Sequence, residues 1–377
     1  MPKSFTHSLT HSFTHSIMKN TYFTPGPAEL YPTIHQHLQR AMDEQIGSIS
    51  HRSKQFRDLY RFMDEQLRTL LAIPDTHGIF ITGSASEVWE RMLLNCVEHE
   101  SFHLVNGSFS QKFYDYANAL HKHAHVLEKP FGEGFDAAEI QVPDYAEVVC
   151  VTHNETSSGV QMKPSEIHKL KRKNPKKLFC VDIVSSAPYP DLDFSLIDST
   201  FFSVQKAFGM PAGMGIWIAS EACLAKAERL QKNDTLTIGA HHTLPALWKH
   251  YKDFETPATP NVLYIYLLGK IAEDFNKIGI DTIRRQTEEK ARMLYKFIES
   301  SDAYEPFVKQ ERHRSQTVIV ATTQKPSSDV IAIGKAANML VGSGYGKFKE
   351  SQIRIANFPA VSPEQVNELI NQLNKIY

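Results

Sequence analysis

The chain has 377 residues, of which 42% are hydrophobic and 22% charged, which is an ordinary composition for a globular protein. Its 41 lysines and arginines nearly balance its 42 aspartates and glutamates, so no overall field favours nucleic acid or a membrane surface as a partner. No apolar run in the sequence approaches the roughly 20 residues that a membrane-spanning helix needs. The length exceeds the usual size of one hydrophobic core and predicts two domains.

The first 19 residues repeat Thr-His-Ser every four positions and contain little that can build a core. We expect a disordered leader here, with metal binding by His7, His11 and His15 as the alternative. The segment lacks the apolar core of a secretory signal. An extended segment over residues 20–30 follows, and its prolines suggest that it runs across the surface between two domains.

Beyond this segment, apolar residues recur at helical spacing from Leu30 to about Met42 and from Lys54 to Leu71. Short apolar runs then alternate with helical stretches such as Glu87–Cys96 and Pro164–Lys171. The predicted strands are Ile79–Ile81, Phe102–Val105, Glu147–Thr152, Leu178–Val184, Thr200–Val204 and Gly215–Ile218. This alternation predicts an α/β domain with a mainly parallel sheet flanked by helices.

Prolines and threonines in Glu255–Pro260 mark a boundary loop, so we predict a large domain over residues 31–260 and a smaller α+β domain over 261–377. The small domain is expected to contain helices from about Asn261, over Asp281–Ser300, near Ser328–Leu340 and from Pro363, with strands at Thr317–Ala321 and Gln352–Ile355. The four cysteines lie in or beside apolar runs without a close pair or a metal-ligand spacing; they are Cys96, Cys150, Cys180 and Cys223. We therefore expect reduced, buried thiols, no metal site and a cytoplasmic protein.

Two predicted strands end in groups that suit one cofactor. Asp182 follows a buried run, and Lys206 follows the next strand along the chain, flanked by apolar residues. Pyridoxal phosphate needs a lysine for its Schiff base and a carboxylate that keeps its pyridine nitrogen protonated. The alternatives are a carboxylate that caps a turn and a surface lysine at a strand end.

Other candidate groups lie at the same predicted sheet edge, because ligands of parallel sheets bind at the carboxyl ends of strands. Thr82–Ser86 offers backbone N–H groups and hydroxyls where a helix begins, which favours phosphate binding, although an ordinary serine N-cap explains it equally well. Asn154 or Thr156 is a candidate for the phenolic oxygen of the cofactor. Phe109 is a candidate for stacking on its ring, with a core phenylalanine as the alternative.

Four separated motifs give the chain a family resemblance, and it extends from about Tyr22 to the carboxyl end. The motifs are Phe23–Ala28, His51–Lys54, Asn154–Thr156, and Gln205–Lys206 with Pro211–Gly213. In them the sequence resembles the class V, fold-type I pyridoxal phosphate aminotransferases, and within that family the phosphoserine aminotransferase group. The resemblance implies a large pyridoxal phosphate-binding domain with a mainly parallel sheet and a smaller C-terminal domain. It also implies transamination of a small anionic amino acid with a 2-oxo acid.

By position, the resemblance assigns a role to each matching residue. Lys206 and Asp182 are the implied catalytic residues, and Phe109 and Thr156 contact the cofactor ring. The implied phosphate contacts are Ser84, Ala85, Ser86 and Gln205, completed by Thr256 and Thr259 of a neighbouring subunit, which makes a homodimer with shared active sites obligatory. Arg354 is implied for the substrate α-carboxylate. His51 and Arg52 are implied for the distal phosphate or carboxylate.

Three departures from the family pattern concern the substrate. Phe109 stands where a tryptophan is usual, and Ser86 where phosphoserine enzymes often carry arginine. The stretch Gly342–Lys347 lacks the usual histidine, with Lys347 as a candidate substitute. Phosphoserine:2-oxoglutarate transamination in serine biosynthesis is the preferred prediction, and alanine- or serine-glyoxylate transamination is the alternative. A cysteine desulfurase is disfavoured, because no cysteine follows the boundary loop at Glu255–Pro260.

Overall fold

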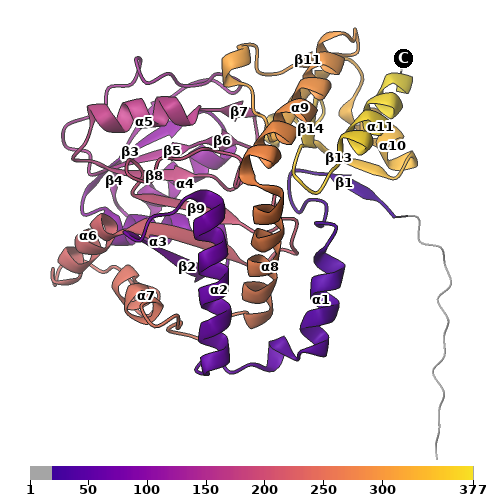
Figure 1. The fold of residues 1–377 in the computed structure, drawn as a ribbon. Coiled ribbons are helices and arrows are strands. Elements are labelled where there is room, and N and C mark those ends of the chain that lie inside the picture. Colours follow the sequence, from indigo (N-terminus) through magenta and orange to yellow (C-terminus); the bar gives the residue numbers. More distant parts are fainter. Residues whose placement is uncertain (1–18, 377) are drawn as a thin grey trace, which may run out of the picture.

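The computed structural model describes residues 19–376, so the predicted leader lies almost entirely outside the described residues. A seven-stranded sheet, covered by helices, lies at the centre of the larger part of the molecule (Figure 1). Its strands, in spatial order, are β2 (His77–Thr82), β10 (Gly215–Ser220), β9 (Ser199–Ser203), β8 (Leu178–Asp182), β5 (Val148–Thr152), β3 (Glu100–Val105) and β4 (His123–Glu128). Neighbouring strands are parallel except around β10, which is antiparallel to β2 and β9. The predicted mainly parallel sheet is confirmed.

The central strands are buried on both faces because helices cover both. Along β8, Phe179 and Val181 belong to one apolar cluster and Cys180 to the other, as the alternation of side chains in a strand requires. The first cluster packs against α1 (Ile34–Asp43), α2 (Lys54–Leu71), α5 (Pro164–Lys173) and α8 (Val262–Ile278). The second packs against α3 (Ala85–Cys96), α4 (Ser108–Ala119), α6 (Glu221–Gln231) and α7 (Leu244–Tyr251). All four cysteines are free and buried, as predicted.

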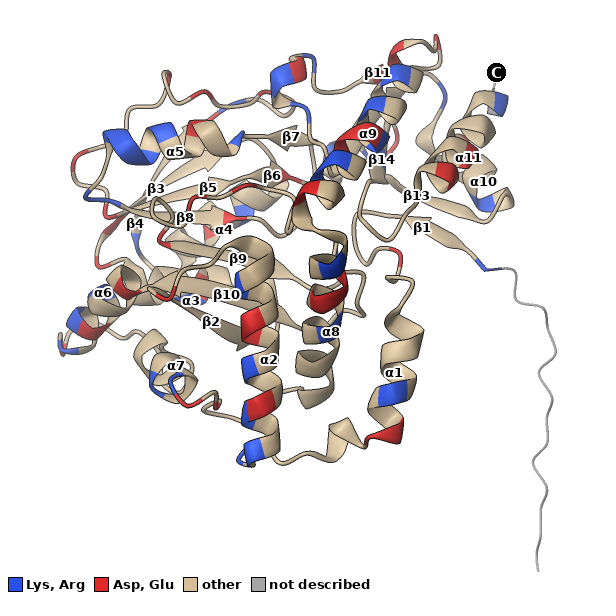
Figure 2. Ribbon diagram, viewed as in Figure 1, with Lys and Arg blue, Asp and Glu red and all other residues tan. Residues whose placement is uncertain are grey.

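Charged residues lie mainly on the helices and loops around this sheet. Figure 2 shows the strands almost free of lysine, arginine, aspartate and glutamate, whereas α2, α5 and α9 carry them in numbers. The helices are therefore amphipathic, with their apolar faces turned to the sheet. Within residues 19–376 no helix combines the length and apolarity that a bilayer crossing requires.

A second sheet of five strands holds the C-terminal part of the chain. Its order is β1 (Thr21–Phe23), β13 (Met339–Ser343), β14 (Gln352–Ala356), β12 (Val318–Thr323) and β11 (Tyr304–Pro306). Helices α9 (Ile280–Glu299), α10 (Ser327–Ala336) and α11 (Pro363–Leu373) pack against it. Short 3-10 helices cover Ile46–Ser48, Glu311–His313, Gly346–Phe348 and Asn374–Ile376, and β6 (Asn154–Glu155) pairs with β7 (Val160–Gln161).

Two details differ from the sequence-based expectations. The segment 20–30 lies only partly on the surface: Tyr22, Gly26 and Pro27 are exposed, but β1 pairs in parallel with β13, and Phe23 is fully buried. The helix expected near Ser328–Leu340 ends at Ala336, because Met339 already begins β13. Helix α8 packs in the apolar cluster of the large sheet, and the domain division at residue 260 stays a prediction.

Candidate active site

Strand register brings the predicted cofactor-binding segments to one edge of the large sheet. Thr152 at the end of β5 is paired with Asp182 at the end of β8, and Asp182 in turn with Phe201 of β9. Gly215 of β10 faces both Ser203, where β9 ends, and Thr82, where β2 ends. The loops that carry the predicted site residues therefore leave the sheet side by side.

Asp182 is 3% exposed and held by two hydrogen bonds. The backbone N–H of Val184 donates to its Oδ1 at 2.8 Å, and the Trp89 indole N–H donates to its Oδ2 at 3.2 Å. Asp182 thus does cap the turn after its strand. Burial is the main cause that raises the pKa of Asp182 to about 7, and these two hydrogen bonds only partly oppose it. A buried carboxyl of this kind has a strong electrostatic demand for a cationic N–H partner.

Lys206 is only partly exposed, and its Nζ donates to the carbonyl oxygen of Pro25 at 2.5 Å. Desolvation, followed by the charge of Arg354, lowers the pKa of Lys206 to about 8. The neighbouring Gly26 has φ +137°, and a Cβ atom there would lie 2.4 Å from the lysine Nζ. The interpretation of Lys206 as an ordinary surface lysine is therefore wrong, since its amine is enclosed by the N-terminal segment and loses its proton more readily than an exposed lysine does.

The glycine turn after β2 begins helix α3. The Ser84 hydroxyl accepts a hydrogen bond from the backbone N–H of Glu87 at 3.2 Å, so Ser84 is an N-cap. The Ala85 N–H donates to Ser203 Oγ at 3.2 Å, which ties the turn to the end of β9. Ser86 lies exposed in the first turn of α3, where the N–H groups and the helix dipole favour an anion. Gln205 is fixed through its carbonyl oxygen, which accepts from Ala28 N at 3.1 Å.

Glu155 is a site residue that the sequence reasoning did not single out. It is fully buried, and its carboxylate accepts hydrogen bonds from the backbone N–H groups of Phe109, Ser110 and Ser157 and from both serine hydroxyls. This carboxylate sits at the start of α4, where the helix dipole favours negative charge. It thereby fixes Phe109 beside the strand end that carries Thr156. Its position between Asn154 and Thr156 was the one signal available in the sequence.

Arg354 projects from β14 of the small sheet toward the same region. Its Nε donates to the Ser343 carbonyl at 2.8 Å and its Nη1 to the Thr156 carbonyl at 3.4 Å. Burial lowers the pKa of Arg354 somewhat from its ordinary value, yet at neutral pH a guanidinium keeps its charge. The contact with Thr156 places a cation from the five-stranded sheet beside the segment that follows β5 and β6.

Four predicted site residues lie away from Lys206 within a single chain; they are His51, Arg52, Thr256 and Thr259. Arg52 Nη1 donates to the Thr256 carbonyl at 3.1 Å and to Glu255 at 3.3 Å, and His51 contacts the Phe56 ring edge-on. Thr256 and Thr259 line a cavity of about 260 Å³ together with Thr82 and Gly83. The buried Thr256 hydroxyl has no hydrogen-bond partner among the described residues. No contact of these four residues reaches Lys206 or Arg354 within the described part of one chain.

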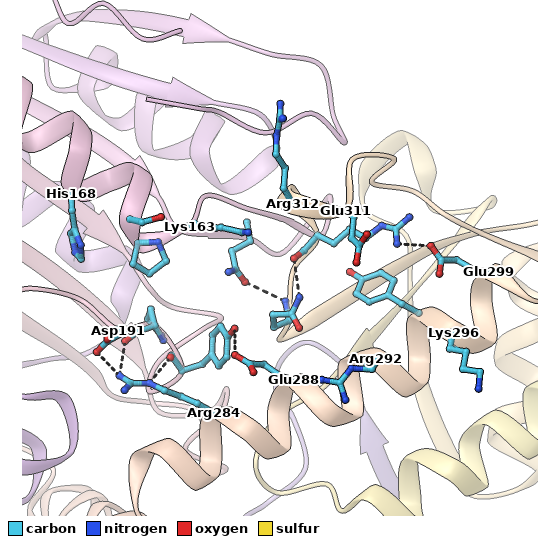
Figure 3. A pocket seen from close by; sticks show the side chains of 18 of the residues that line it. Lys163, His168, Asp191, Arg284, Glu288, Arg292, Lys296, Glu299, Glu311 and Arg312 are labelled. Atoms are coloured by element: carbon cyan, nitrogen blue, oxygen red, sulfur yellow. Dashed lines mark hydrogen bonds and ion pairs between the residues drawn. The ribbon is translucent and has the colours of Figure 1, made fainter. Parts of the chain in front are cut away.

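A larger cleft of about 1200 Å³ lies elsewhere, between α5, the loop at Tyr189–Asp191 and helix α9 (Figure 3). Ion pairs and hydrogen bonds cross or flank it: Arg284 pairs with Asp191 at 3.0 Å, and the Tyr189 hydroxyl donates to Glu288 at 3.2 Å. None of the predicted site residues lines this cleft. Size alone therefore does not identify the active site, which is better located by the buried titratable groups at the sheet edge.

The residues at this edge fit pyridoxal phosphate. Among residues 19–376 no ion pair joins Asp182 to a cation, and a pyridinium N–H would supply one; Lys206 offers an amine with a lowered pKa. The buried Thr152 Oγ1 and Asn154 Oδ1 atoms have no hydrogen-bond partner among the described residues and are available to a polar ligand. Among residues 19–376 no cluster of side chains is suited to a metal ion. This fold and this set of side chains define a pyridoxal phosphate-dependent enzyme of fold type I.

Comparison with known proteins gives the family. The model of the family Aminotransferase class-V matches residues 22–347. The chain belongs to this family and is a pyridoxal phosphate-dependent transaminase.

Among solved structures, it is similar to a phosphoserine aminotransferase from Cytophaga hutchinsonii, with 48% identity and a TM-score of 0.92 over 94% of this chain and 98% of the other. The phosphoserine aminotransferase of Rhodococcus opacus is 26% identical over 93% of this chain and 94% of its own length. An alanine-glyoxylate aminotransferase from Nostoc shares the fold, with a TM-score of 0.83, 19% identity and 95% of each chain covered.

Proposed function

We propose that the chain catalyses transamination between phosphoserine and 2-oxoglutarate. The observation that carries the proposal is the similarity to the Cytophaga phosphoserine aminotransferase, 48% identical over nearly the whole of both chains. The geometry supports it, because Arg354 places a cation for an α-carboxylate next to the strand end that carries Thr156. Serine biosynthesis is the corresponding pathway, and we infer a cytoplasmic location from the four free, buried thiols.

The proposed roles follow from the charges and contacts of each side chain. Bound pyridoxal phosphate supplies an aldehyde that reacts with amines and a ring that withdraws electrons from the substrate. Lys206 provides the amine that holds the cofactor, and once released it carries a proton between the substrate Cα and the cofactor carbon. Asp182 stabilises the protonated pyridine nitrogen, and Arg354 binds the substrate α-carboxylate.

The remaining residues position the cofactor in this proposal. The N–H groups and hydroxyls at Ser84, Ala85 and Ser86, with Gln205, bind the phosphate. Thr156 donates to the phenolic oxygen. Phe109 lies against one face of the ring, and the Glu155 carboxylate fixes the backbone that carries Phe109.

We further propose a homodimer with shared active sites. Among residues 19–376 of one chain, no hydrogen bond or ion pair joins His51, Arg52, Thr256 or Thr259 to Lys206 or Arg354. The Arg52 guanidinium does donate to the Thr256 carbonyl. In the proposed dimer, the second subunit places both segments in the site of the first. Its Thr256 and Thr259 contact the cofactor phosphate, and its His51 and Arg52 contact the distal anion of the substrate.

A mixing experiment tests the shared site. Lys206→Ala and Arg52→Ala dimers are each inactive or weak with phosphoserine, but a mixed dimer contains one site with both native residues. Reassembling the two variants should restore activity toward half of the wild-type value per mixed dimer. Activity that stays at the sum of the two separate variants would show that Arg52 acts in its own chain's site or not at all.

A substrate panel tests the reaction itself. Phosphoserine, alanine and serine are compared as donors, with 2-oxoglutarate and glyoxylate as acceptors. We expect phosphoserine with 2-oxoglutarate to give the highest kcat/KM. The glyoxylate pairings represent the alternative function, and a clear preference for them would refute the proposal. Ser86 and the Gly342–Lys347 stretch depart from the phosphoserine pattern, so the panel tests the point at which the resemblance is weakest. Borohydride treatment should fix the cofactor on Lys206 in the wild type and on nothing in Lys206→Ala.

A further inference from the structure

Tyr345 lies between the proposed ring-stacking residue and the proposed carboxylate-binding arginine. Its ring centroid is 5.4 Å from that of Phe109, and the Arg354 guanidinium carbon lies 5.3 Å from the same ring. Tyr345 therefore links α4, the helix that follows β3 of the large sheet, to β14 of the small sheet. A substrate whose carboxylate binds Arg354 has this aromatic ring as a neighbour.

Lys112 brings a second cation to this ring. It follows Phe109 by one turn of α4, so both side chains lie on one face of the helix. Its Nζ donates to the Tyr345 hydroxyl at 3.1 Å and lies 5.4 Å from the Phe109 ring centroid. Among the described residues no carboxylate pairs with Lys112, and its side chain is exposed. The Lys112 ammonium group thus lies beside the ring that Arg354 also contacts and has no carboxylate partner among the described residues.

Lys347, the candidate substitute for the missing basic residues, makes different contacts. Its Nζ lies 5.8 Å from the Phe131 ring and 5.3 Å from the Phe348 ring, and these two rings contact each other at 5.6 Å. It therefore packs on a separate aromatic pair rather than on Tyr345. The loop supplies Tyr345 to the site, while its own lysine packs against other rings.

We propose that Lys112 and the Tyr345 hydroxyl form a distal-anion contact that determines specificity for substrates with a second negative charge. The inference rests on the proposed function and names a residue pair for the phosphate of phosphoserine and for the distal carboxylate of glutamate. A phenol that accepts a hydrogen bond from Lys112 keeps its own O–H free to donate to an anion. The pair thus offers one cationic and one neutral donor from the same chain that contributes Lys206 and Arg354.

The test uses the holoenzyme and single-turnover half-reactions, in which each amino donor converts the cofactor without any acceptor. Lys112→Met removes the charge and keeps the length, Lys112→Arg keeps the charge, and Lys347→Met is the matched control on the other aromatic pair. We expect Lys112→Met to raise the apparent Kd for phosphoserine and glutamate about tenfold and to leave that for alanine within about twofold. Lys112→Arg should retain most of the affinity, and Lys347→Met should match the wild type.

A second readout is equilibrium binding of O-phospho-3-hydroxypropionate, which is phosphoserine without its amine; it carries both anions and cannot react. Its affinity should fall with Lys112→Met and recover with Lys112→Arg. Equal effects of Lys112→Met on phosphoserine and alanine, or no effect on either, would overturn the inference. The outcome is separate from the proposed function, which the wild-type substrate panel decides, because glutamate reports on Lys112 even if phosphoserine proves a poor substrate.

Discussion

Asp182 gives a quantitative prediction for the protein without its cofactor. Its pKa is raised from 3.8 to about 7, chiefly by burial, which corresponds to roughly 4 kcal/mol at about 1.4 kcal/mol per unit. Between these values the unfolded chain binds fewer protons at this residue than the folded chain does. The free energy of unfolding therefore falls as the pH rises from about 4 to about 7 and changes little above that.

Replacing Asp182 with Asn removes this pH dependence. Between pH 5 and pH 8 the wild-type cofactor-free protein should lose roughly 3 kcal/mol more of its free energy of unfolding than the Asp182→Asn variant. The substitution also alters the hydrogen bond to Trp89, and this lowers the free energy of unfolding equally at both pH values. The difference between the two pH values therefore does not contain that cost. Asp281→Asn is the matched control, because that carboxylate is 91% exposed and should leave the wild-type pH dependence unchanged.

The assay is chemical denaturation of the cofactor-free proteins at pH 5 and pH 8, repeated at pH 8 with saturating pyridoxal phosphate. The cofactor should stabilise the wild type more than Asp182→Asn, since a pyridinium N–H relieves the buried charge only where a carboxylate is present. If the stability curves of wild type and Asp182→Asn run parallel with pH, Asp182 titrates normally and the account of its burial is wrong.

Three further changes test the environment of the site. Gly26→Ala should lower kcat at least tenfold, because its Cβ would displace the Lys206 amine, whereas Gly47→Ala, with open space around it, should not. Glu155→Ala should lower the free energy of unfolding by about 3 kcal/mol or more, measured by denaturant titration, because it leaves several buried donors unpaired. Arg354→Gln removes a positive charge near the lysine, so the pH profile for pyridoxal phosphate uptake by the cofactor-free protein should move to higher pH.

Each of these has a clear contrary result. Equal activity of the Gly26 and Gly47 variants would mean that the lysine amine tolerates displacement. A Glu155 variant as stable as the wild type would show that its donors find water instead. An unchanged uptake profile in Arg354→Gln would place the guanidinium too far away to influence Lys206.

The large sheet was predictable because its strands are short apolar runs that end in polar turns. The segments that became β5 and β9 are buried throughout, and β8 is buried from Phe179 onward, so each appears in the sequence as a short apolar run. Strand β4 was missed, since His123–Glu128 lies at the sheet edge, contains no fully buried residue and carries polar side chains. The antiparallel direction of β10 depends on its pairing with β2 and β9, which no local pattern reveals.

Lys206 and Asp182 were identifiable as candidates because each follows an apolar strand, but their partners were not. The Trp89 indole reaches Asp182 from helix α3, 93 positions earlier in the sequence, and Pro25 lies 181 positions before Lys206. In the sequence Glu155 is one polar residue in a predicted loop. In the structure it is buried and accepts hydrogen bonds from backbone N–H groups at the start of α4. Such contacts arise from tertiary packing and leave no periodicity behind.

The pairing of β1 with β13 bears on the order in which the enzyme matures. Thr21 aligns with Met339, so the first described strand finds its place only after more than 300 further residues have been synthesised. The same segment continues into Pro25 and Gly26, which enclose the Lys206 amine. Until Met339–Ser343 has been synthesised, β1 has no partner strand, and the segment that encloses the Lys206 amine lacks this support. The geometry in which the lysine amine meets the cofactor therefore depends on a strand that is synthesised more than 300 residues after the segment that encloses the amine.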